Sequence, residues 1–279
     1  MPCLKPLLLK RRGSHSANSN QYVGCGRCIP CRLDYSHQWA TRCVHEAELH
    51  RFNHFVTLTF DDDHLPEDYS LCKDTAQKWL KRLRYYLDAP FRYFLAGEYG
   101  EQLGRPHYHA LLFGADLRTW HTHQGKSFAL PLAPIPGTEL SRSSLLESSW
   151  PFGFSSVAEF NFQTAAYVAR YCVKKYNGPA AADHYQGRLP EFALMSRNPG
   201  LGAEWIARFK SDVFPRDEVR INGHTRTPPR FYLSKLPPDE QDSIKSARSG
   251  TTRRALDFQQ QEAREAVVLH HHHQRKKTL

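Results

Sequence analysis

The stretch 104-GRPHYHALLF-113 decides the fold and supplies the first candidate site. It predicts a β-strand that begins after a glycine and a proline and ends at Phe113. Side chains alternate between the two faces of a strand, so His107 and His109 leave the same side of the sheet. Two imidazoles on one strand need only a carboxylate from a neighbouring strand to complete a three-ligand metal site. Glu98, nine residues before His107, is the candidate carboxylate.

The composition favours a polyanionic partner. The chain of 279 residues has 38 Lys and Arg against 28 Asp and Glu, a formal net charge of +10. Nucleic acid is favoured over a membrane, because the sequence has no apolar run of spanning length and no basic amphipathic helix. The apolar run at the N-terminus is too short for a signal peptide, so we expect a cytoplasmic protein whose seven cysteines are thiols or metal ligands.

The hydrophobic pattern predicts an α+β fold built on an antiparallel sheet. Helices are expected at 30–49, 73–87 and 163–176, and strands at 55–60, 91–98, 107–113 and 153–160. The short Gly-rich connection 99–106 favours an antiparallel hairpin. Residues 11–24 are expected to form a loop, and 115–150 a long excursion with a short helix near 143–149. This order predicts a ferredoxin-like (RRM-like) sandwich with helices on one face of the sheet.

Three segments are expected along the chain. Residues 1–50 form a Cys-rich N-terminal arm and helix, 51–180 form the core with an insertion at about 115–150, and 181–279 form a C-terminal extension. From about residue 237 the sequence is charged and Gln-rich, which predicts a helical tail that is mobile or contacts nucleic acid.

A second motif lies on the helix predicted at 163–176. Tyr167 and Tyr171 are four residues apart, so both phenols project from one face and can reach a single site. On an isolated helix, two tyrosines packed into the core are the alternative. Three cations of this helix can stabilise a phenolate or contact phosphate: Arg170, Lys174 and Lys175. Arg105 is a further candidate contact to DNA.

The two motifs together predict phosphodiester chemistry. A phenolate can attack a phosphodiester when a divalent ion withdraws charge from a non-bridging oxygen, and the phosphotyrosine product retains the energy of the broken bond. Such an enzyme rejoins DNA without ATP. The sequence agrees, because Gly125-Lys126-Ser127 resembles the end of a phosphate-binding loop but Trp120 stands where that loop requires glycine.

At these residues the chain resembles the HUH endonucleases, which include the rolling-circle replication initiators. Three segments resemble the family motifs in order: 55–60, 106–113 and 167–175. Within that superfamily the chain is similar to the initiators of microviruses, of the gokushovirus type. Three further segments carry this similarity: 25–32, 195–202 and 228–232.

The resemblance implies a metal site. His107 and His109 match the metal-binding pair, and Glu98 stands where related initiators have their carboxylate ligand. Glu101 is a rival for that third position. Mg²⁺ or Mn²⁺ is expected, although two imidazoles also suit zinc.

The resemblance also implies the reaction. Tyr167 and Tyr171 match the two nucleophiles of the two-tyrosine class, and Lys174 matches the lysine that follows them. One tyrosine would nick viral origin DNA, single-stranded or supercoiled, and remain bound to the 5′ phosphate. The second would cut the regenerated origin so that the first strand closes into a circle. The implied partners are a host polymerase and helicase in the bacterial cytoplasm.

The cysteines suggest a structural zinc site. Cys25, Cys28 and Cys31 have the knuckle spacing, and tetrahedral closure needs a fourth ligand. Cys3 is preferred over Cys43, which lies about 18 Å of helical rise from Cys31. Free thiols at a helix start are the alternative. Two other cysteines are expected to be small buried residues: Cys72 and Cys172.

Two other functions compete with a nickase. A hydrolase of the histidine-triad type is disfavoured because Leu111 stands where a third alternating histidine is required. A non-enzymatic basic zinc-knuckle protein could use its tyrosines to stack on nucleic-acid bases. The paired tyrosines beside a histidine pair favour the nickase.

Overall fold

The chain folds into two compact units in the computed structural model. The structure describes residues 3–10, 20–100, 103–121, 126–174 and 180–249, and also residues 260, 263, 266, 267 and 270. One unit joins residues 1–38 to 236–279, and the larger unit comprises residues 39–235. The expected three-part division of the chain stays a prediction.

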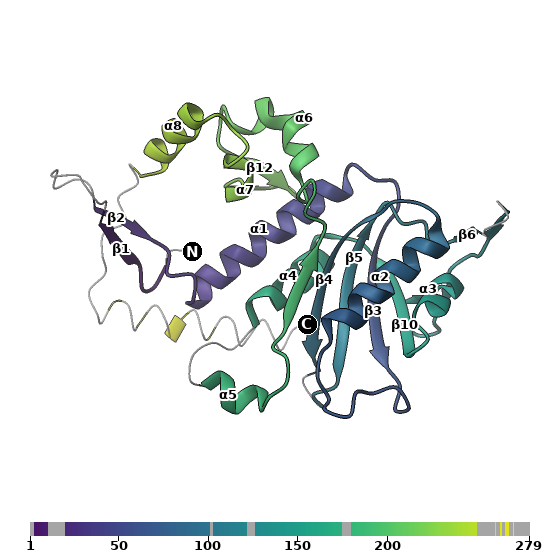
Figure 1. Cartoon of the computed structure of the whole chain (residues 1–279). Coiled ribbons are helices and arrows are strands. Elements are labelled where there is room, and N and C mark those ends of the chain that lie inside the picture. The colour runs from purple at the N-terminus through teal and green to yellow at the C-terminus, as the bar shows by residue number, and fades with distance from the viewer. Residues whose placement is uncertain are drawn as a thin grey trace. The chain divides into compact units, whose positions relative to one another are not determined.

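An antiparallel sheet forms the centre of the larger unit (Figure 1). Within the described ranges its strand order is β11-β4-β5-β3-β10-β9-β8. The strands are β3 (Asn53–Phe60), β4 (Arg92–Tyr99), β5 (Pro106–Phe113), β8 (Ala133–Pro134), β9 (Ser141–Arg142), β10 (Gly153–Glu159) and β11 (Phe192–Met195). The expected α+β fold, with β4 and β5 as an antiparallel pair, is confirmed. This architecture is consistent with an HUH-like fold.

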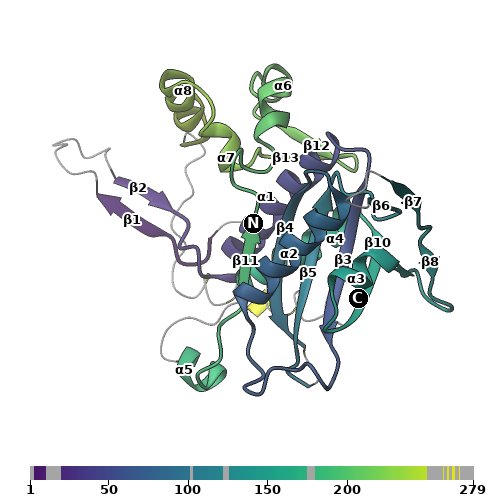
Figure 2. The ribbon, with the colours of Figure 1, turned by 45° about the vertical axis from the view of Figure 1, so that its right-hand side comes forward.

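Helices cover both faces of this sheet, so the expectation of helices on one face is wrong (Figure 2). Four helices are involved: α2 (Lys73–Leu87) and α3 (Ser144–Ser149) on one face, and α1 (Ile29–Ala47) and α4 (Phe162–Lys174) on the other. The reason is that β5 is apolar on both sides. Tyr108 and Leu112 face α2, whereas Leu111 and Phe113 face α4, and both sets are fully buried.

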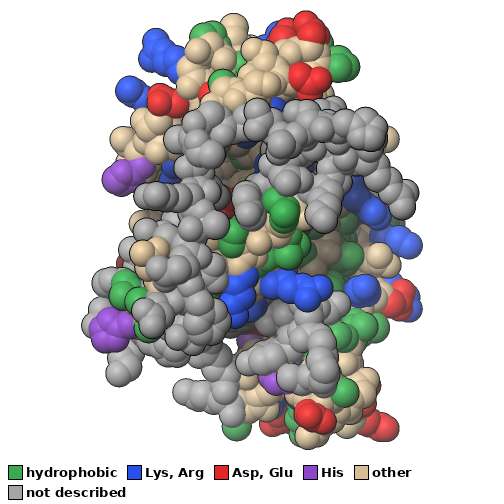
Figure 3. Space-filling model, turned by 90° about the vertical axis from the view of Figure 1, so that its left-hand side faces the viewer, with side chains coloured by type: hydrophobic (Ala, Val, Ile, Leu, Met, Phe, Trp, Pro, Cys, Tyr) green, Lys and Arg blue, Asp and Glu red, His purple; other side chains and the backbone are tan. Residues whose placement is uncertain are grey.

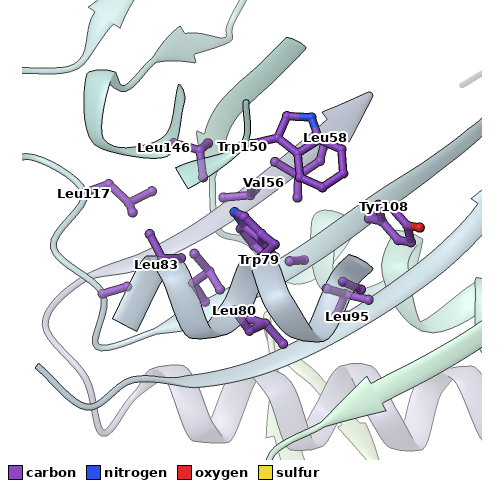
Figure 4. Packing of buried hydrophobic residues seen from close by; sticks show 14 of the residues in the cluster. Val56, Leu58, Trp79, Leu80, Leu83, Leu95, Tyr108, Leu117, Leu146 and Trp150 are labelled. Carbon is purple, nitrogen blue, oxygen red and sulfur yellow. The ribbon is translucent and has the colours of Figure 1, made fainter. Parts of the chain in front are cut away.

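The α2 face holds the larger apolar cluster. The residues of α2 that are buried recur at helical spacing: Ala76, Trp79, Leu80, Leu83 and Leu87. Trp79 lies between the helix and the sheet, near Val56 and Leu146 (Figure 4), and its indole N–H donates to Ser149 Oγ at 3.1 Å. Each such large side chain contributes about 1.5–3 kcal/mol by leaving water.

The long segment expected at 115–150 contains short strands and a helix among its described residues. The structure describes β6 (Thr119–His121) and β7 (Ser127–Ala129) as a pair, and α3 confirms the helix expected near 143–149. The loop expected at 11–24 is wrong at its end, because β2 (Asn20–Val23) pairs with β1 (Leu7–Lys10) in the smaller unit.

Residues beyond 179 add to the sheet and to α1. Helix α5 (Ala180–Tyr185) precedes β11. The elements after β11 are α6 (Ala203–Val213), β12 (Val219–Ile221), β13 (His224–Arg226), α7 (Arg230–Leu233) and α8 (Pro238–Ser249).

His45 of α1 contacts two aromatic residues of this C-terminal part. Its ring stacks on that of Trp205, with the centroids 3.6 Å apart, and its Nδ1 lies 2.8 Å from Tyr232 Oη. Burial lowers the pKa of His45 to about 3, so this imidazole is neutral. No helix among the described residues is long and apolar enough to span a membrane.

Gly153, which opens β10 opposite Phe60, should be essential to the packing of β10 on β3. A Cβ atom there would lie 2.3 Å from the backbone N of Asp61, and φ is +140°. We predict that Gly153→Ala destabilises the fold by about 2 kcal/mol or more, in urea-unfolding measurements. The control Gly223→Ala, at φ +76° with nothing within 4 Å, should cost only about 1 kcal/mol. Equal losses would contradict the steric explanation.

Candidate active site

Strand register brings the predicted metal ligands together. Glu98 on β4 lies directly opposite His107 on β5, and Ala96 lies opposite His109. Side chains two residues apart on a strand lie on the same face of the sheet. Glu98 is therefore on the face of Phe94 and Ala96, and both histidines are on the face of Leu111 and Phe113, which is the face that α4 covers.

The three side chains converge on one point. Glu98 Oε1 lies 3.3 Å from His107 Nε2 and 3.0 Å from His109 Nε2. One ligand atom from each residue lies within 4.8 Å of the others. The side chains of Glu98 and His109 are 6% and 7% exposed, whereas that of His107 is 18% exposed. The cluster therefore opens to solvent on the His107 side. Glu101, the rival ligand, lies outside the described residues.

Thr57 and Phe55 of β3 hold the His109 ring in place. Thr57 Oγ1 lies 3.0 Å from His109 Nδ1, and the Phe55 ring stacks on the imidazole with centroids 5.5 Å apart. A hydrogen bond at Nδ1 fixes the tautomer and leaves Nε2 to bind an ion. Two imidazoles and a carboxylate suit Mg²⁺, Mn²⁺ or zinc, so the residues present fit a divalent ion.

Tyr167 of α4 lies against this cluster. Its ring makes edge-to-face contacts with the rings of His109 and Phe55, with centroids 5.2 and 6.0 Å apart. The helix begins at a reciprocal cap, in which Asn161 Oδ1 accepts from Thr164 N at 2.8 Å and Thr164 Oγ1 accepts from Asn161 N at 2.9 Å. The guanidinium carbon of Arg170 lies 5.7 Å from the centroid of the Tyr167 ring.

The other predicted site residues are placed less completely. Tyr171 and Lys174 belong to α4, one and two turns after Tyr167, and their side chains lie outside the description. Lys175 lies outside the described residues. Arg105 donates to Asp62 Oδ1 at 2.6 Å and to the Phe60 carbonyl at 3.0 Å, so it links the end of β3 to the start of β5. Its contact to DNA stays a prediction.

Sequence reasoning did not identify Gly100 or Thr57. A Cβ on Gly100 would lie 2.8 Å from His107 Cε1, so the absence of a side chain makes room for this imidazole. Thr57 stands one alternation step from Thr59 on the predicted strand, but only the register between β3 and β5 pairs it with His109. The pairing of β3 with β5 cannot be read from the sequence near Thr57.

An antiparallel sheet that carries a histidine pair with a carboxylate, next to a tyrosine on a helix, is consistent with an HUH-like fold. Residues 53–176 match the model of the family of replication-associated protein ORF2/G2P. The resemblance to microvirus-type rolling-circle initiators is thereby confirmed.

Three phage proteins are similar over most of the chain. The replication-associated protein VP4 of Bdellovibrio phage phiMH2K is 30% identical over 217 residues, which are 75% of this chain and 65% of VP4. ORF2 of Spiroplasma virus 4 is 29% identical over 261 residues, 87% of this chain and 77% of ORF2. ORF4 of Chlamydia phage 1 is 27% identical over 217 residues, 76% of this chain and 53% of ORF4. No solved structure matches the chain.

Substitution of Gly100 should weaken metal binding. In Gly100→Ala the new methyl group displaces the His107 imidazole, so we predict that the affinity for Mn²⁺ falls about 10-fold or more, as for changes next to metal ligands. Titration with Mn²⁺, followed by electron paramagnetic resonance, measures this affinity. The control Gly137→Ala, which meets nothing within 4 Å, should leave it unchanged. Equal affinities in both variants and the parent would contradict the site.

Proposed function

We propose that this protein nicks and rejoins one DNA strand at a replication origin by tyrosine attack, as an initiator of rolling-circle replication. The observation that carries this proposal is the edge contact between Tyr167 and His109, because it puts a phenol beside a three-ligand cluster. Neither group alone is specific for this chemistry.

In the proposed step, the oxygen of one tyrosine attacks the phosphorus of a phosphodiester. The new Oη–P bond replaces the P–O3′ bond, the phenol gives up its proton, and the departing 3′ oxygen takes one up. The product is a 5′-phosphotyrosine diester with a free 3′ hydroxyl. Because a diester is still present, the reverse attack by a 3′ hydroxyl rejoins DNA without ATP.

The residues have separate roles in this proposal. Glu98, His107 and His109 would hold an ion, which withdraws charge from a non-bridging phosphate oxygen when bound. Arg170, close to the Tyr167 ring, favours the phenolate over the neutral phenol. Tyr171 is the second nucleophile and Lys174 a further cation, since both follow Tyr167 at whole helical turns.

Charge supports DNA as the substrate. The net charge of +10 favours a polyanion. In the view of Figure 3, Lys and Arg side chains lie next to one another on the visible face. Origin DNA, a host helicase and a host polymerase in the bacterial cytoplasm are the partners that follow from the proposed reaction, with Arg105 and Lys175 as contacts to the strand.

Covalent capture tests the proposal. Tiled single-stranded oligonucleotides from the replicon that encodes the chain are incubated with the protein and Mn²⁺, and a denaturing gel detects the adduct. We predict that Tyr167→Phe and Tyr171→Phe each impair the full cycle of cutting and circularisation, and that the double variant forms no adduct. EDTA should also abolish the adduct, and Tyr85→Phe, at an exposed position of α2, should behave like the parent.

Peptide mapping of the adduct identifies the tyrosine that is bound to DNA. An adduct that persists in the double variant would refute the assignment of the nucleophiles. Tight binding to the oligonucleotides with no adduct under any metal condition would instead support the non-enzymatic zinc-knuckle function.

A further inference from the structure

We propose that Cys3, Cys25, Cys28 and Cys31 bind one structural Zn²⁺ ion in the smaller unit. Their four Sγ atoms lie within 4.8 Å of one another, although Cys3 is 22 residues from Cys25 in the sequence. Four thiolates at this separation suit the tetrahedral sulfur site that zinc prefers. The site shares no residue with the proposed active site.

The backbone around Cys25 has the form of a metal knuckle. The N–H groups of Arg27 and Cys28 donate to Cys25 Sγ at 3.4 and 3.3 Å, and the N–H of Cys25 donates to Cys3 Sγ at 3.2 Å. Gly26 has φ +71°, a conformation that glycine adopts at little cost and that lets the chain turn back on the sulfur. Hydrogen bonds of this kind stabilise thiolates, which are the form that binds metal.

The structure also favours Cys3 over Cys43 as the fourth ligand. Cys43 is fully buried in the apolar cluster of α1, α4 and the sheet, in the larger unit. The four proposed ligands are all partly exposed, and Sγ of Cys3 lies 3.7 Å from Sγ of Cys28. Cys3 lies before the β1–β2 hairpin and the other three cysteines lie after it, and a shared metal ion explains why their sulfur atoms are close together.

An ion at this site would connect the two ends of the β1–β2 hairpin to the start of α1. Cys3 precedes β1, Cys25 follows β2, and Cys28 and Cys31 lie where α1 begins. The hairpin has little apolar core of its own, because Leu7 and Leu8 are 53% and 42% exposed. Two-stranded hairpins are marginally stable in water, so in this proposal the bound ion and its four cysteines, the metal clasp, stabilise the folded hairpin.

Cobalt substitution of the full-length protein tests the site. We expect one Zn²⁺ per chain by elemental analysis, and thiolate-to-cobalt charge-transfer bands in the near ultraviolet after exchange with Co²⁺. Cys3→Ser, Cys25→Ser, Cys28→Ser and Cys31→Ser should each lose most of the bands. Cys72→Ser should keep them. Cys72 lies outside the cluster and is partly exposed, so the expectation that it is buried is wrong.

Three outcomes would overturn the zinc proposal. The first is a reduced chain that gives no thiolate charge-transfer band with Co²⁺, and the second is bands that persist in all four cluster variants. The third is a disulfide between two of these cysteines in the freshly purified protein, with no metal. Because histidine and carboxylate ligands give no thiolate bands, the result is independent of the proposed active site.

A separate observation concerns Phe154, and here the inference rests on the proposed function. We propose that the Phe154 ring stacks on a base of the DNA strand next to the scissile phosphate. Phe154 lies within β10 yet is 71% exposed. An aromatic ring on a sheet strand that is open to solvent is available to a partner.

Register places Phe154 in line with the metal cluster. Phe154 is opposite Thr59, and Thr59 is opposite His107, so the three residues share one face of the sheet. Two strand spacings separate Phe154 from His107 by roughly 10 Å, about three nucleotides of stacked DNA. His107 is also the most exposed of the three proposed metal ligands. Aromatic rings beside such a path bind single strands by stacking, whatever the base sequence.

Abasic scanning of an oligonucleotide tests the stacking. With EDTA present to prevent cleavage, we expect Phe154→Ala to lower the affinity for single-stranded DNA roughly 5-fold or more in fluorescence anisotropy, and Phe154→Trp to keep it. One abasic position should weaken binding by the parent but not by Phe154→Ala. The control Phe128→Ala, an exposed phenylalanine of β7, should match the parent.

Unchanged affinity in Phe154→Ala would refute this role, as would a loss that no abasic position removes. Binding is measured without cleavage, so a parent protein that forms no covalent adduct can still show the stacking. The failure of the proposed function and the failure of this inference are therefore distinguishable.

Discussion

The antiparallel register of β4, β5 and β3 is the constraint on which the site depends. It sets Glu98, His107 and Thr59 in one row across the sheet, and His109 and Thr57 in the next. A shift of one residue in either pairing would turn these side chains to the opposite face. The apolar clusters on both faces oppose such a shift, because it would bring the polar row into contact with α2 and the core. Packing of the core therefore aligns the metal ligands.

This dependence explains what the sequence could predict. His107 and His109 share a strand, and Tyr167 and Tyr171 share a helix, so simple periodicity relates each pair. Glu98 could be inferred because a short connection joins its strand to the next. The contact between Thr57 and His109 joins residues 52 positions apart, which no local pattern reports. Strand β11 was missed for a similar reason, since its four residues gain their stability from pairing with β4.

The two proposed metal sites differ in the chemistry of their ligands. The four cysteines would bind zinc through soft thiolates, whereas the Glu98 cluster offers one carboxylate and two imidazoles, which accept Mg²⁺ and Mn²⁺ as well as zinc. The sequence spacing pointed to three thiols of the clasp, but only the fold brings Cys3 to them, because β1 and β2 pair along their whole length.

The cluster has two distinct sides, and the proposed reaction needs both. Displacement at phosphorus requires the attacking and leaving oxygens to lie roughly in line. Tyr167 approaches from α4, beside the well-buried His109. Phe154, which is open to solvent, lies on the same face of the sheet as the more exposed His107, two strands away. In the proposed complex the phenol attacks from α4, and the strand with its leaving 3′ oxygen extends toward β10. A base stacked on Phe154 would hold it in that line.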